Sequence, residues 1–228
     1  KLQDYDSYLA QLQKELKQRR QELETASEQL SNERKAQALQ LEKAIETELK
    51  DLNFAEVQFQ IHFDKLADYT ADGVDDVEFL ISMNPGQPVK PLAEVASGGE
   101  LSRTMLAIKT VMADRDEIET LIFDEIDVGI SGRTAQKVSE KMAVIGRNHQ
   151  VICITHLAQI AAQADQHYLI EKTVDGGVTR TEIRKLSEEE SVDELARILG
   201  GAEITETVRM SAREMKSMVK SNTVKNKK

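Results

Sequence analysis

An uninterrupted heptad repeat at the start of the chain limits what this sequence can fold into. The first 72 residues contain neither glycine nor proline, and a leucine recurs at every seventh position: Leu2, Leu9, Leu16, Leu23 and Leu30. The second apolar position of each heptad lies three residues after the leucine. In the first four heptads it holds Tyr5, Leu12, Arg19 and Ala26, so a charged residue interrupts it once. This spacing predicts a coiled-coil helix whose seam is buried by another helix.

The repeat changes register beyond Leu30 without a helix-breaking residue. Leu30 and Leu41 are 11 residues apart, one heptad plus four, a spacing that locally unwinds a supercoil. The apolar face then continues through Ala38, Leu41, Ile45, Leu49 and Leu52. A helix over residues 2–52 would be about 75 Å long, far longer than most helices of globular domains. We therefore expect residues 1–52 to form a coiled-coil arm, rather than an amphipathic helix lying on its own domain.

The composition limits the class of protein. The chain has 228 residues, with 30 Lys and Arg against 40 Asp and Glu, so its net charge is −10. This balance argues against a protein that coats nucleic acid through its overall charge, although a local basic patch remains compatible with it. The single cysteine, Cys153, excludes a disulfide framework or a thiolate metal cluster within one chain.

Targeting signals are also missing from the sequence. No apolar run approaches the length of about 20 residues that spans a bilayer, and residues 1–6 lack the apolar stretch of a secretion signal. We therefore expect a cytoplasmic protein without a membrane partner. Because the chain starts inside the helical pattern and has no initiator methionine, we also expect it to be part of a longer protein.

Beyond residue 52 the periodicity changes to that of a mixed α/β domain. Alternation predicts strands over 57–63 and 77–81, and short apolar runs predict strands over 120–123 and 150–155 that are buried on both faces of a parallel sheet. The same patterns predict a strand over 168–171 and a turn at Gly176–Gly177 leading into a strand over 178–184. They also predict helices from 99, over 135–145 and over 157–164, and a helical region over 191–218 that is broken at Gly200–Gly201. Strands that alternate with helices predict an α/β fold with right-handed crossovers. We assign residues 53–220 to one lobe and residues 221–228 to a basic, disordered tail.

The first chemistry-bearing segment is Ser97-Gly98-Gly99-Glu100, at the start of the predicted helix. Two glycines let the backbone approach a ligand closely, and the free N–H groups and positive dipole end of a helix start attract an anionic phosphate. The Ser97 hydroxyl can add a hydrogen bond. Taken alone, Ser-Gly-Gly is more often a helix cap or a turn.

The second and third segments follow the two predicted buried strands. Asp124 and Glu125 come directly after residue 123, at the carboxyl end of a strand, where ligands of open α/β sheets bind. Asp124 is suited to hold Mg²⁺ and Glu125 to polarise a water for attack on a phosphoryl group. His156 follows the next strand and can contact a γ-phosphate or orient that water. Each feature alone also fits a solvated strand end or an incidental histidine.

The order and spacing of these segments resemble the carboxyl-terminal half of ATP-binding-cassette heads, where they are the signature motif, the Walker B strand, the D-loop and the switch histidine. The flanking runs narrow the resemblance to the RecN family of SMC-like ATPases, which act in recombinational repair of DNA double-strand breaks in bacteria. These runs are Val95–Arg103, Phe123–Gly132 and Thr155–Ile160, within a similarity over roughly Val57–Leu199.

The resemblance implies a role for each matching residue. Ser97, Gly98 and Gly99, with Glu100 in the same motif, would bind the γ-phosphate of ATP held by an opposing head. Asp124 would serve Mg²⁺, Glu125 would be the catalytic base and His156 the switch, and Asp127 would lie at the head–head seam. The implied partners are a second head in a homodimer, an amino-terminal lobe and outgoing coil of the same protein, and DNA, in the bacterial cytoplasm at the nucleoid.

A phosphate-binding loop of the type Gly-x-x-x-x-Gly-Lys-[Ser/Thr] is missing, because none of the 11 glycines is followed by lysine. We therefore expect the full protein to hydrolyse ATP and this chain alone to be inactive. Two alternatives remain open. A non-catalytic coiled-coil scaffold is disfavoured by the adjacent acids Asp124 and Glu125, and a transporter ATPase subunit is disfavoured by the long coil and by Ile126, where such subunits usually have proline.

Overall fold

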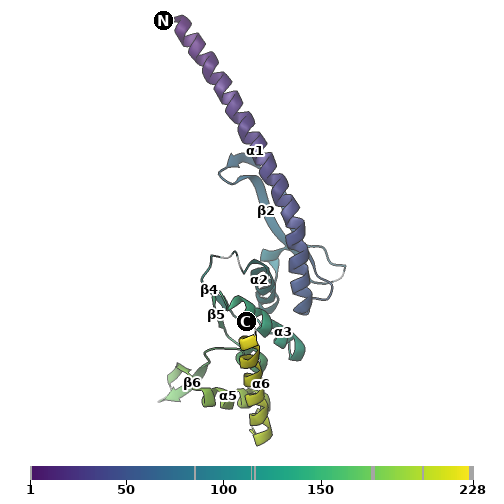
Figure 1. Ribbon diagram of the computed structural model, residues 1–228, viewed down its shortest axis with the longest axis vertical. Coiled ribbons are helices and arrows are strands. Elements are labelled where there is room, and N and C mark those ends of the chain that lie inside the picture. The colour runs from purple at the N-terminus through teal and green to yellow at the C-terminus, as the bar shows by residue number, and fades with distance from the viewer. Residues whose placement is uncertain are drawn as a thin grey trace. The chain divides into compact units, whose positions relative to one another are not determined.

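The computed structural model describes residues 2–84, 86–113, 115, 117–175, 178–201 and 203–225. The chain divides into two compact units, one of residues 1–47 and 56–94 and the other of residues 48–55 and 95–228. The predicted turn at Gly176–Gly177 and the last three residues of the predicted tail lie outside the described residues. The predicted mixed α/β fold with a long amino-terminal helix is confirmed (Figure 1). Among the described helices, none combines the length and apolarity needed to span a membrane.

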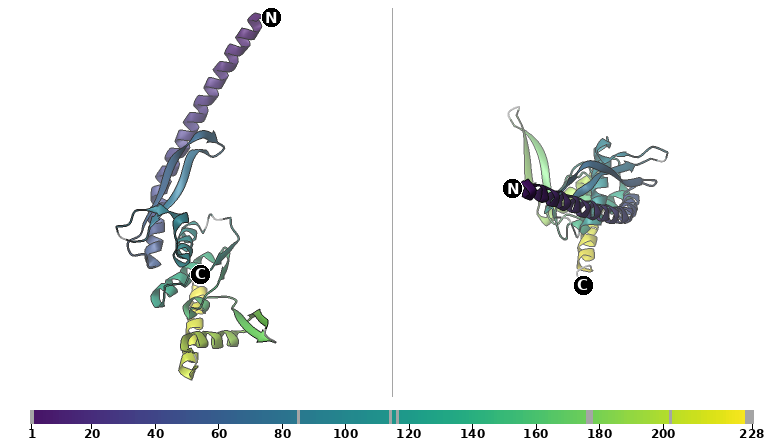
Figure 2. Two further views of the ribbon diagram at one scale, coloured as in Figure 1. Left: turned by 180° about the vertical axis from the view of Figure 1, so that it is seen from behind. Right: turned by 90° about the horizontal axis from the view of Figure 1, so that it is seen from above.

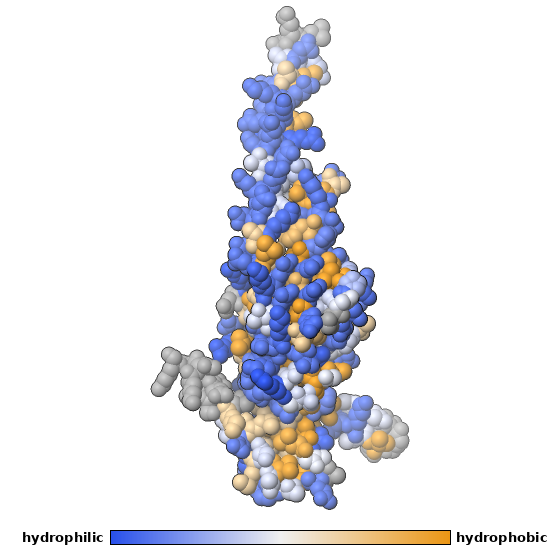
Figure 3. Space-filling view, turned by 90° about the vertical axis from the view of Figure 1, so that its right-hand side faces the viewer, coloured by the Kyte–Doolittle hydropathy of each residue, from blue (hydrophilic) through white to orange (hydrophobic). Residues whose placement is uncertain are grey.

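Helix α1 (Leu2–Asp51) is a single helix of 50 residues, close to the predicted range of 2–52. Most of it belongs to the first unit, and its last turn belongs to the second. Four of the seam leucines are solvent-exposed, from 38% at Leu9 to 70% at Leu16, with Leu23 and Leu30 between them. In Figure 3 the amino-terminal part of α1 is correspondingly hydrophilic, with scattered apolar residues. The apolar positions nearer its carboxyl end are covered, and Ile45 is fully buried.

The rest of the first unit is a small antiparallel sheet. Strands β1 (Gln58–Thr70) and β2 (Gly73–Ser82) form a hairpin, and the short β3 (Lys90–Pro91) pairs with β2 before a single 3₁₀ turn, η1 (Leu92–Glu94). The hairpin lies alongside α1, as the two side views show (Figures 1 and 2). The unit therefore joins a segment that we had assigned to the lobe with the helix that we had assigned to the arm.

Contacts between α1 and β1 hold this unit together. The backbone N–H of Phe59 donates to Glu46 at 3.0 Å, and that of Ile61 donates to Glu42 at 2.7 Å. Phe59 is 1% exposed, and its ring lies 5.5 Å from that of Phe79. Carboxylates of α1 thus accept hydrogen bonds from the outer edge of β1, which would otherwise offer unpaired donors.

The second unit contains two further sheets and five helices among its described residues. In chain order its elements are α2 (Gly98–Met112), β4 (Thr120–Phe123), α3 (Gly132–Ile145), β5 (Gln150–Cys153), α4 (Ala158–Ala161), β6 (Tyr168–Asp175), β7 (Val178–Lys185), α5 (Glu188–Gly200) and α6 (Glu206–Lys225). Strands β4 and β5 are parallel, as predicted, and their carboxyl ends are level because Phe123 pairs with Cys153.

Two sequence-based expectations about these strands are wrong. The strand predicted at 168–171 does not extend the parallel sheet, because β6 pairs with β7 in an antiparallel hairpin of its own. The two segments are neighbours in sequence, so pairing locally costs less chain entropy than reaching the distant parallel pair. The other error concerns burial. Phe123 is 5% exposed, but Ile122 is 67% and Ile152 is 44% exposed, so one face of β4 and β5 is open among the described residues.

Helices α5 and α6 pack around small apolar residues. Leu195 and Ala212 are fully buried in a cluster that also includes residues of α4. Helix α5 starts with a capping box between Ser187 and Glu190, and the β6–β7 hairpin projects from these helices (Figure 2). Helix α6 extends to Lys225, so helix covers the first part of the segment predicted as a disordered tail.

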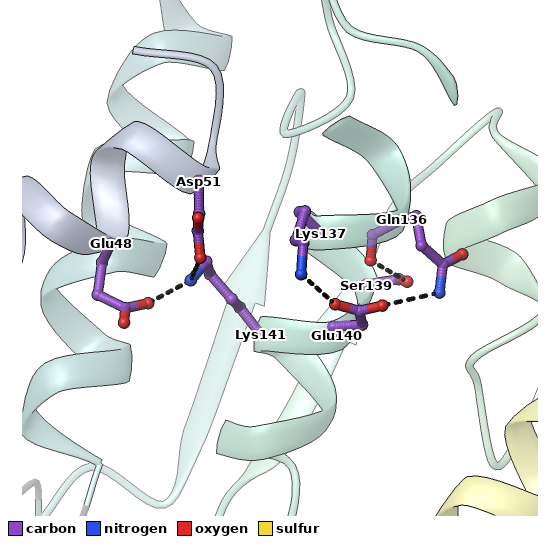
Figure 4. A network of polar contacts seen from close by, with 7 residues as sticks. All are labelled: Glu48, Asp51, Gln136, Lys137, Ser139, Glu140 and Lys141. Carbon is purple, nitrogen blue, oxygen red and sulfur yellow. Dashed lines mark hydrogen bonds and ion pairs between the residues drawn. The ribbon is translucent and has the colours of Figure 1, made fainter. Parts of the chain in front are cut away.

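A buried lysine joins α3 to the last turn of α1 (Figure 4). Lys141 Nζ donates to Glu48 and, at 3.0 Å, to Asp51, and its side chain is 10% exposed. Burial by itself would lower the pKa of Lys141, but the hydrogen bonds that it donates to the two carboxylates, together with their charges, outweigh this effect, and the pKa is raised. The same helix carries a surface pair between Lys137 and Glu140 at 3.0 Å.

Candidate functional site

The start of α2 is built as an N-cap followed by two glycines. Ser97 has an extended backbone, and its hydroxyl accepts a hydrogen bond from the Glu100 backbone N–H at 3.4 Å. Ser97 is half-buried and Gly98 is exposed. The start of α2 is therefore capped, because the Ser97 hydroxyl accepts a hydrogen bond from one of the free N–H groups of the helix. Phosphate binding at this helix terminus stays a prediction.

Helix α2 holds the loop that follows β4. Ser102 Oγ donates to the carbonyl of Asp124 at 2.7 Å. Arg103 Nη1 donates to the carbonyls of Ile126 at 3.3 Å and Val128 at 2.8 Å. These bonds fix residues 124–128 against the helix that starts with the predicted signature motif.

The two glycines permit the closeness of this contact. A Cβ atom at Gly99 would lie 3.0 Å from the carbonyl oxygen of Glu125 and 3.1 Å from that of Val128. A Cβ atom at Gly98 would collide with Oε2 of Glu125, so this carboxylate lies over Gly98 of its own chain. Glu125 also has a φ of 57°, a left-handed conformation that non-glycine residues adopt at a cost of about 1–2 kcal/mol. The candidate base is thus held in a strained loop against the signature glycines.

Asp124 is exposed at the carboxyl end of β4, where the sequence predicts it. Its Oδ1 accepts a hydrogen bond from the Glu125 backbone N–H at 2.8 Å. Within the described residues there is no group of three or more His, Cys, Asp and Glu side chains that could hold a metal ion. One accessible carboxylate fits Mg²⁺ of the kind that is shared with phosphate oxygens and water, rather than enclosed by protein.

Asp127 and His156 are brought together by the parallel pairing of β4 and β5. The Asp127 side chain is 4% exposed, and its Oδ2 accepts hydrogen bonds from Thr155 Oγ1 at 2.6 Å and from the His156 backbone N–H at 2.8 Å. The same oxygen lies 3.0 Å from Nδ1 of His156, whose side chain is 72% exposed. Asp127, which the resemblance places at a head–head seam, is therefore buried in this structure and directed at His156.

Arg103 is a residue of this site that the sequence analysis missed. It is 7% exposed, its guanidinium carbon lies 5.4 Å from the centre of the Phe54 ring, and burial lowers its pKa. Its Nε is buried without a hydrogen-bond partner. The available signal was its position within the helical period, three residues before Leu106 and four before Ala107, which are both buried.

Negative charge gathers at this end of the parallel strands. Burial raises the pKa of the Cys153 thiol to about 12, and the charges of Asp127 and Asp124 add to this effect. A site of this charge favours a cation over a free anion.

Comparison with family models gives no match to this chain. Among curated proteins, the chain is 45% identical over 214 residues to the DNA repair protein RecN of Halalkalibacterium halodurans, covering 92% of this chain and 38% of that protein. It is 38% identical over 229 residues to the DNA repair protein RecN of Bacillus subtilis, covering 94% of this chain and 40% of that protein. The chain thus spans about two fifths of the length of these relatives.

Similar solved structures are head domains of SMC proteins. The Smc head domain with a coiled coil and joint from Pyrococcus yayanosii aligns with a TM-score of 0.49 and 24% identity, over 71% of this chain and 29% of that chain. The Smc head domain from Pyrococcus furiosus, bound to the C-terminal domain of ScpA, aligns with a TM-score of 0.47 and 22% identity, over 73% of this chain and 39% of that chain. From the sequence matches, the chain is over most of its length a homologue of part of the RecN DNA repair proteins.

Proposed function

We propose that the chain is the returning coil and carboxyl-terminal head lobe of a RecN-type, SMC-like ATPase that acts in recombinational repair of DNA double-strand breaks. The observation that carries this proposal is the linkage of three segments by hydrogen bonds. The start of α2, the acids after β4 and the histidine after β5 form one polar cluster, through Ser102, Arg103 and Asp127. A coiled-coil scaffold has no need for such a cluster.

Each residue takes a distinct role in the proposed reaction. Asp124 would hold Mg²⁺, which would supply neutralising charge for phosphoryl transfer when bound. Glu125 accepts the proton of the attacking water. His156, at the same edge of the sheet, contacts the γ-phosphate or that water through its exposed ring.

The start of α2 serves the nucleotide of a second head in the proposed homodimer. Ser97, Gly98, Gly99 and Glu100 present the helix terminus and the serine hydroxyl to the γ-phosphate. Because the Glu125 carboxylate lies over Gly98, a phosphate that docks there has to displace it. Phosphate binding at one head is thereby linked to the position of the base in the same chain.

In the proposed architecture, the remaining parts of the full ATPase lie outside this chain. An amino-terminal lobe supplies the phosphate-binding loop, and DNA binds the full protein in the cytoplasm at the nucleoid. An outgoing coil pairs with the arm proposed over residues 1–52 along its exposed leucines, from Leu9 to Leu30. The head lobe proposed over 53–220 carries all of its candidate site residues in the second structural unit. We propose that this chain alone does not hydrolyse ATP.

The test is Glu125→Gln in the full protein that contains this chain. Loss of a general base lowers the rate about 100-fold or more, so ATP turnover should fall by that factor while ATP binding and ATP-dependent head association persist. Glu119→Gln changes an exposed acid just before β4 and should leave turnover unchanged. Full turnover in Glu125→Gln would exclude Glu125 as the base, and loss of head association would make it structural. For this chain alone, magnesium-dependent turnover that disappears in Glu125→Gln would contradict the need for a second lobe.

A further inference from the structure

The surroundings of His156 carry an inference that rests on the proposed function and goes beyond it. We propose that Asp127 is a positioning residue, which holds His156 in the tautomer with its proton on Nδ1 and leaves Nε2 free to face the nucleotide.

The tautomer follows from the chemistry of the two groups. An ionised carboxylate can only accept hydrogen bonds, so Nδ1 of His156, 3.0 Å from Oδ2 of Asp127, must donate. In the neutral ring the other nitrogen, Nε2, is then an acceptor. The two side chains differ in exposure, because the Asp127 carboxylate is 4% exposed and the His156 imidazole is 72% exposed. The ring is therefore anchored on its buried side and presents Nε2 outward.

The carboxylate also fixes the backbone that carries the ring. Its Oδ2 receives Thr155 Oγ1 at 2.6 Å and the His156 backbone N–H at 2.8 Å, and Thr155 Oγ1 in turn accepts the Leu157 N–H at 3.0 Å. Asp127 belongs to the loop that Arg103 holds against α2. His156 is therefore tied to the same loop that carries Asp124 and Glu125, and a group that orients water near a γ-phosphate gains from such a fixed geometry.

The tautomer can be read directly by long-range ¹H–¹⁵N spectra of the imidazole rings in the labelled chain. A pH of about 8 lies above the ordinary histidine pKa of about 6.5. The sequence has four histidines, and the signals of His156 are those lost in His156→Gln. We expect Nδ1 of His156 to appear as the protonated nitrogen in the wild type. In Asp127→Asn the amide can donate as well as accept, so the protonated nitrogen should shift toward Nε2.

Two control variants separate positioning from a general effect on folding. Asp165→Asn changes an exposed acid outside this network and should leave the His156 signals unchanged. Thr155→Val removes another donor to Asp127 but keeps the Asp127–His156 pair, so the Nδ1–H tautomer should persist even if stability falls. A wild-type ring protonated on Nε2 would overturn the inference, as would an unchanged tautomer in folded Asp127→Asn. If Asp127→Asn does not fold, the spectra of the wild type and of Thr155→Val still show whether His156 carries its proton on Nδ1.

Kinetics in the full protein test the consequence for the reaction. Loss of a group that orients a catalytic residue costs about 10–100-fold, so Asp127→Asn should lower kcat by about tenfold or more and change KM for ATP by less than about twofold. Lowered ATP-dependent head association with unchanged kcat would instead assign Asp127 to the seam and overturn the inference. If the wild type does not hydrolyse ATP while the tautomer responds as expected, the proposed function fails and the Asp127–His156 pairing stands.

Discussion

The ion pair between α3 and the last turn of α1 predicts a large effect of Lys141→Met on stability. The Lys141 side chain is 10% exposed, and its two partners differ in burial, with Glu48 at 26% and Asp51 at 53%. Methionine keeps most of the aliphatic stem and its packing. It removes the charge and both hydrogen bonds, and it leaves two carboxylates side by side without their cation.

The two partners contribute unequally to the expected loss. A hydrogen bond to a charged group that is shielded from water stabilises by about 1.5–3 kcal/mol, and an exposed ion pair by about 0.2–1 kcal/mol. We assign about 1.5 kcal/mol to the Glu48 bond and about 0.5 kcal/mol to the half-exposed Asp51 bond, so the free energy of unfolding should fall by about 2 kcal/mol at neutral pH. Because the pKa of Lys141 is raised above its ordinary 10.5, this contribution is complete below pH 10.5 and is lost as the pH rises through the folded-state value.

Urea unfolding followed by circular dichroism at 222 nm measures this change. The matched control is Lys137→Met in the same helix, because the Lys137 and Glu140 side chains are 39% and 48% exposed and their pair should contribute less than about 0.5 kcal/mol. In a double-mutant cycle, Glu48→Gln should couple to Lys141→Met more strongly than Asp51→Asn does. Equal losses in Lys141→Met and Lys137→Met would refute the reasoning.

Three further substitutions and one measurement of thiol reactivity test separate parts of the structure. Ser97→Ala should lower the free energy of unfolding by only about 0.5 kcal/mol, because the N-cap bond is long at 3.4 Å; a loss above about 2 kcal/mol would show a different role for the hydroxyl. Gly99→Ala should destabilise by about 1–3 kcal/mol in urea unfolding, because its Cβ would press on backbone carbonyls 3.0 and 3.1 Å away; a stabilised variant would contradict the close packing. Hydrogen bonds from Ser187 hold the pKa of Glu190 at about 2, so its stabilisation is present above pH 4.5 and is lost as the pH falls toward 2. Thermal melts of Glu190→Gln should lose this acid dependence, and an unchanged slope would show that the capping box does not titrate. With its pKa raised to about 12, Cys153 should react with iodoacetamide at pH 8 at least about tenfold more slowly in the native chain than in urea; equal rates would contradict its shielding.

Periodicity was sufficient to predict the longer helices and most strands, because helix and strand patterns are local, but the short β3 and η1 were not predicted, and β1 extends to Thr70 rather than to residue 63. Helix α1 ends one residue before its predicted end, and β4 covers the predicted residues 120–123. Pairing was harder to predict, because it depends on contacts between distant residues. Nothing in the alternation of residues 57–63 indicates that Glu42 and Glu46, on the preceding helix, accept hydrogen bonds from the edge of β1. The turn predicted between β6 and β7 is local, but their separation from the parallel sheet is not, because it depends on whether β6 reaches the distant strands β4 and β5.

In the candidate site, too, the residue types could be predicted from the sequence, whereas the contacts between them could not. Ser97, the acids after β4 and His156 could be proposed from their types and positions, and the parallel register places the last two groups at level strand ends. The linking bonds could not be proposed in this way. Arg103 donates to the carbonyls of Ile126 and Val128, and a backbone carbonyl is supplied by any residue type. The sequence at Ile126 and Val128 therefore cannot indicate that their carbonyls accept these hydrogen bonds. Only Arg103, a charged residue at a buried position, indicates that such bonds exist.

These hydrogen bonds connect the loop after β4 to both of the other segments of the candidate site. Arg103 and Ser102 attach it to α2, and Asp127 attaches it to the backbone and ring that follow β5. If the start of α2 is displaced, Glu125 and His156 should move with it, unless the hydrogen bonds of 2.6–2.8 Å that link these segments break. Since the Glu125 carboxylate lies over Gly98, the proposed binding of a phosphate at this helix terminus would act on the proposed base directly, and on His156 through one loop of the same chain.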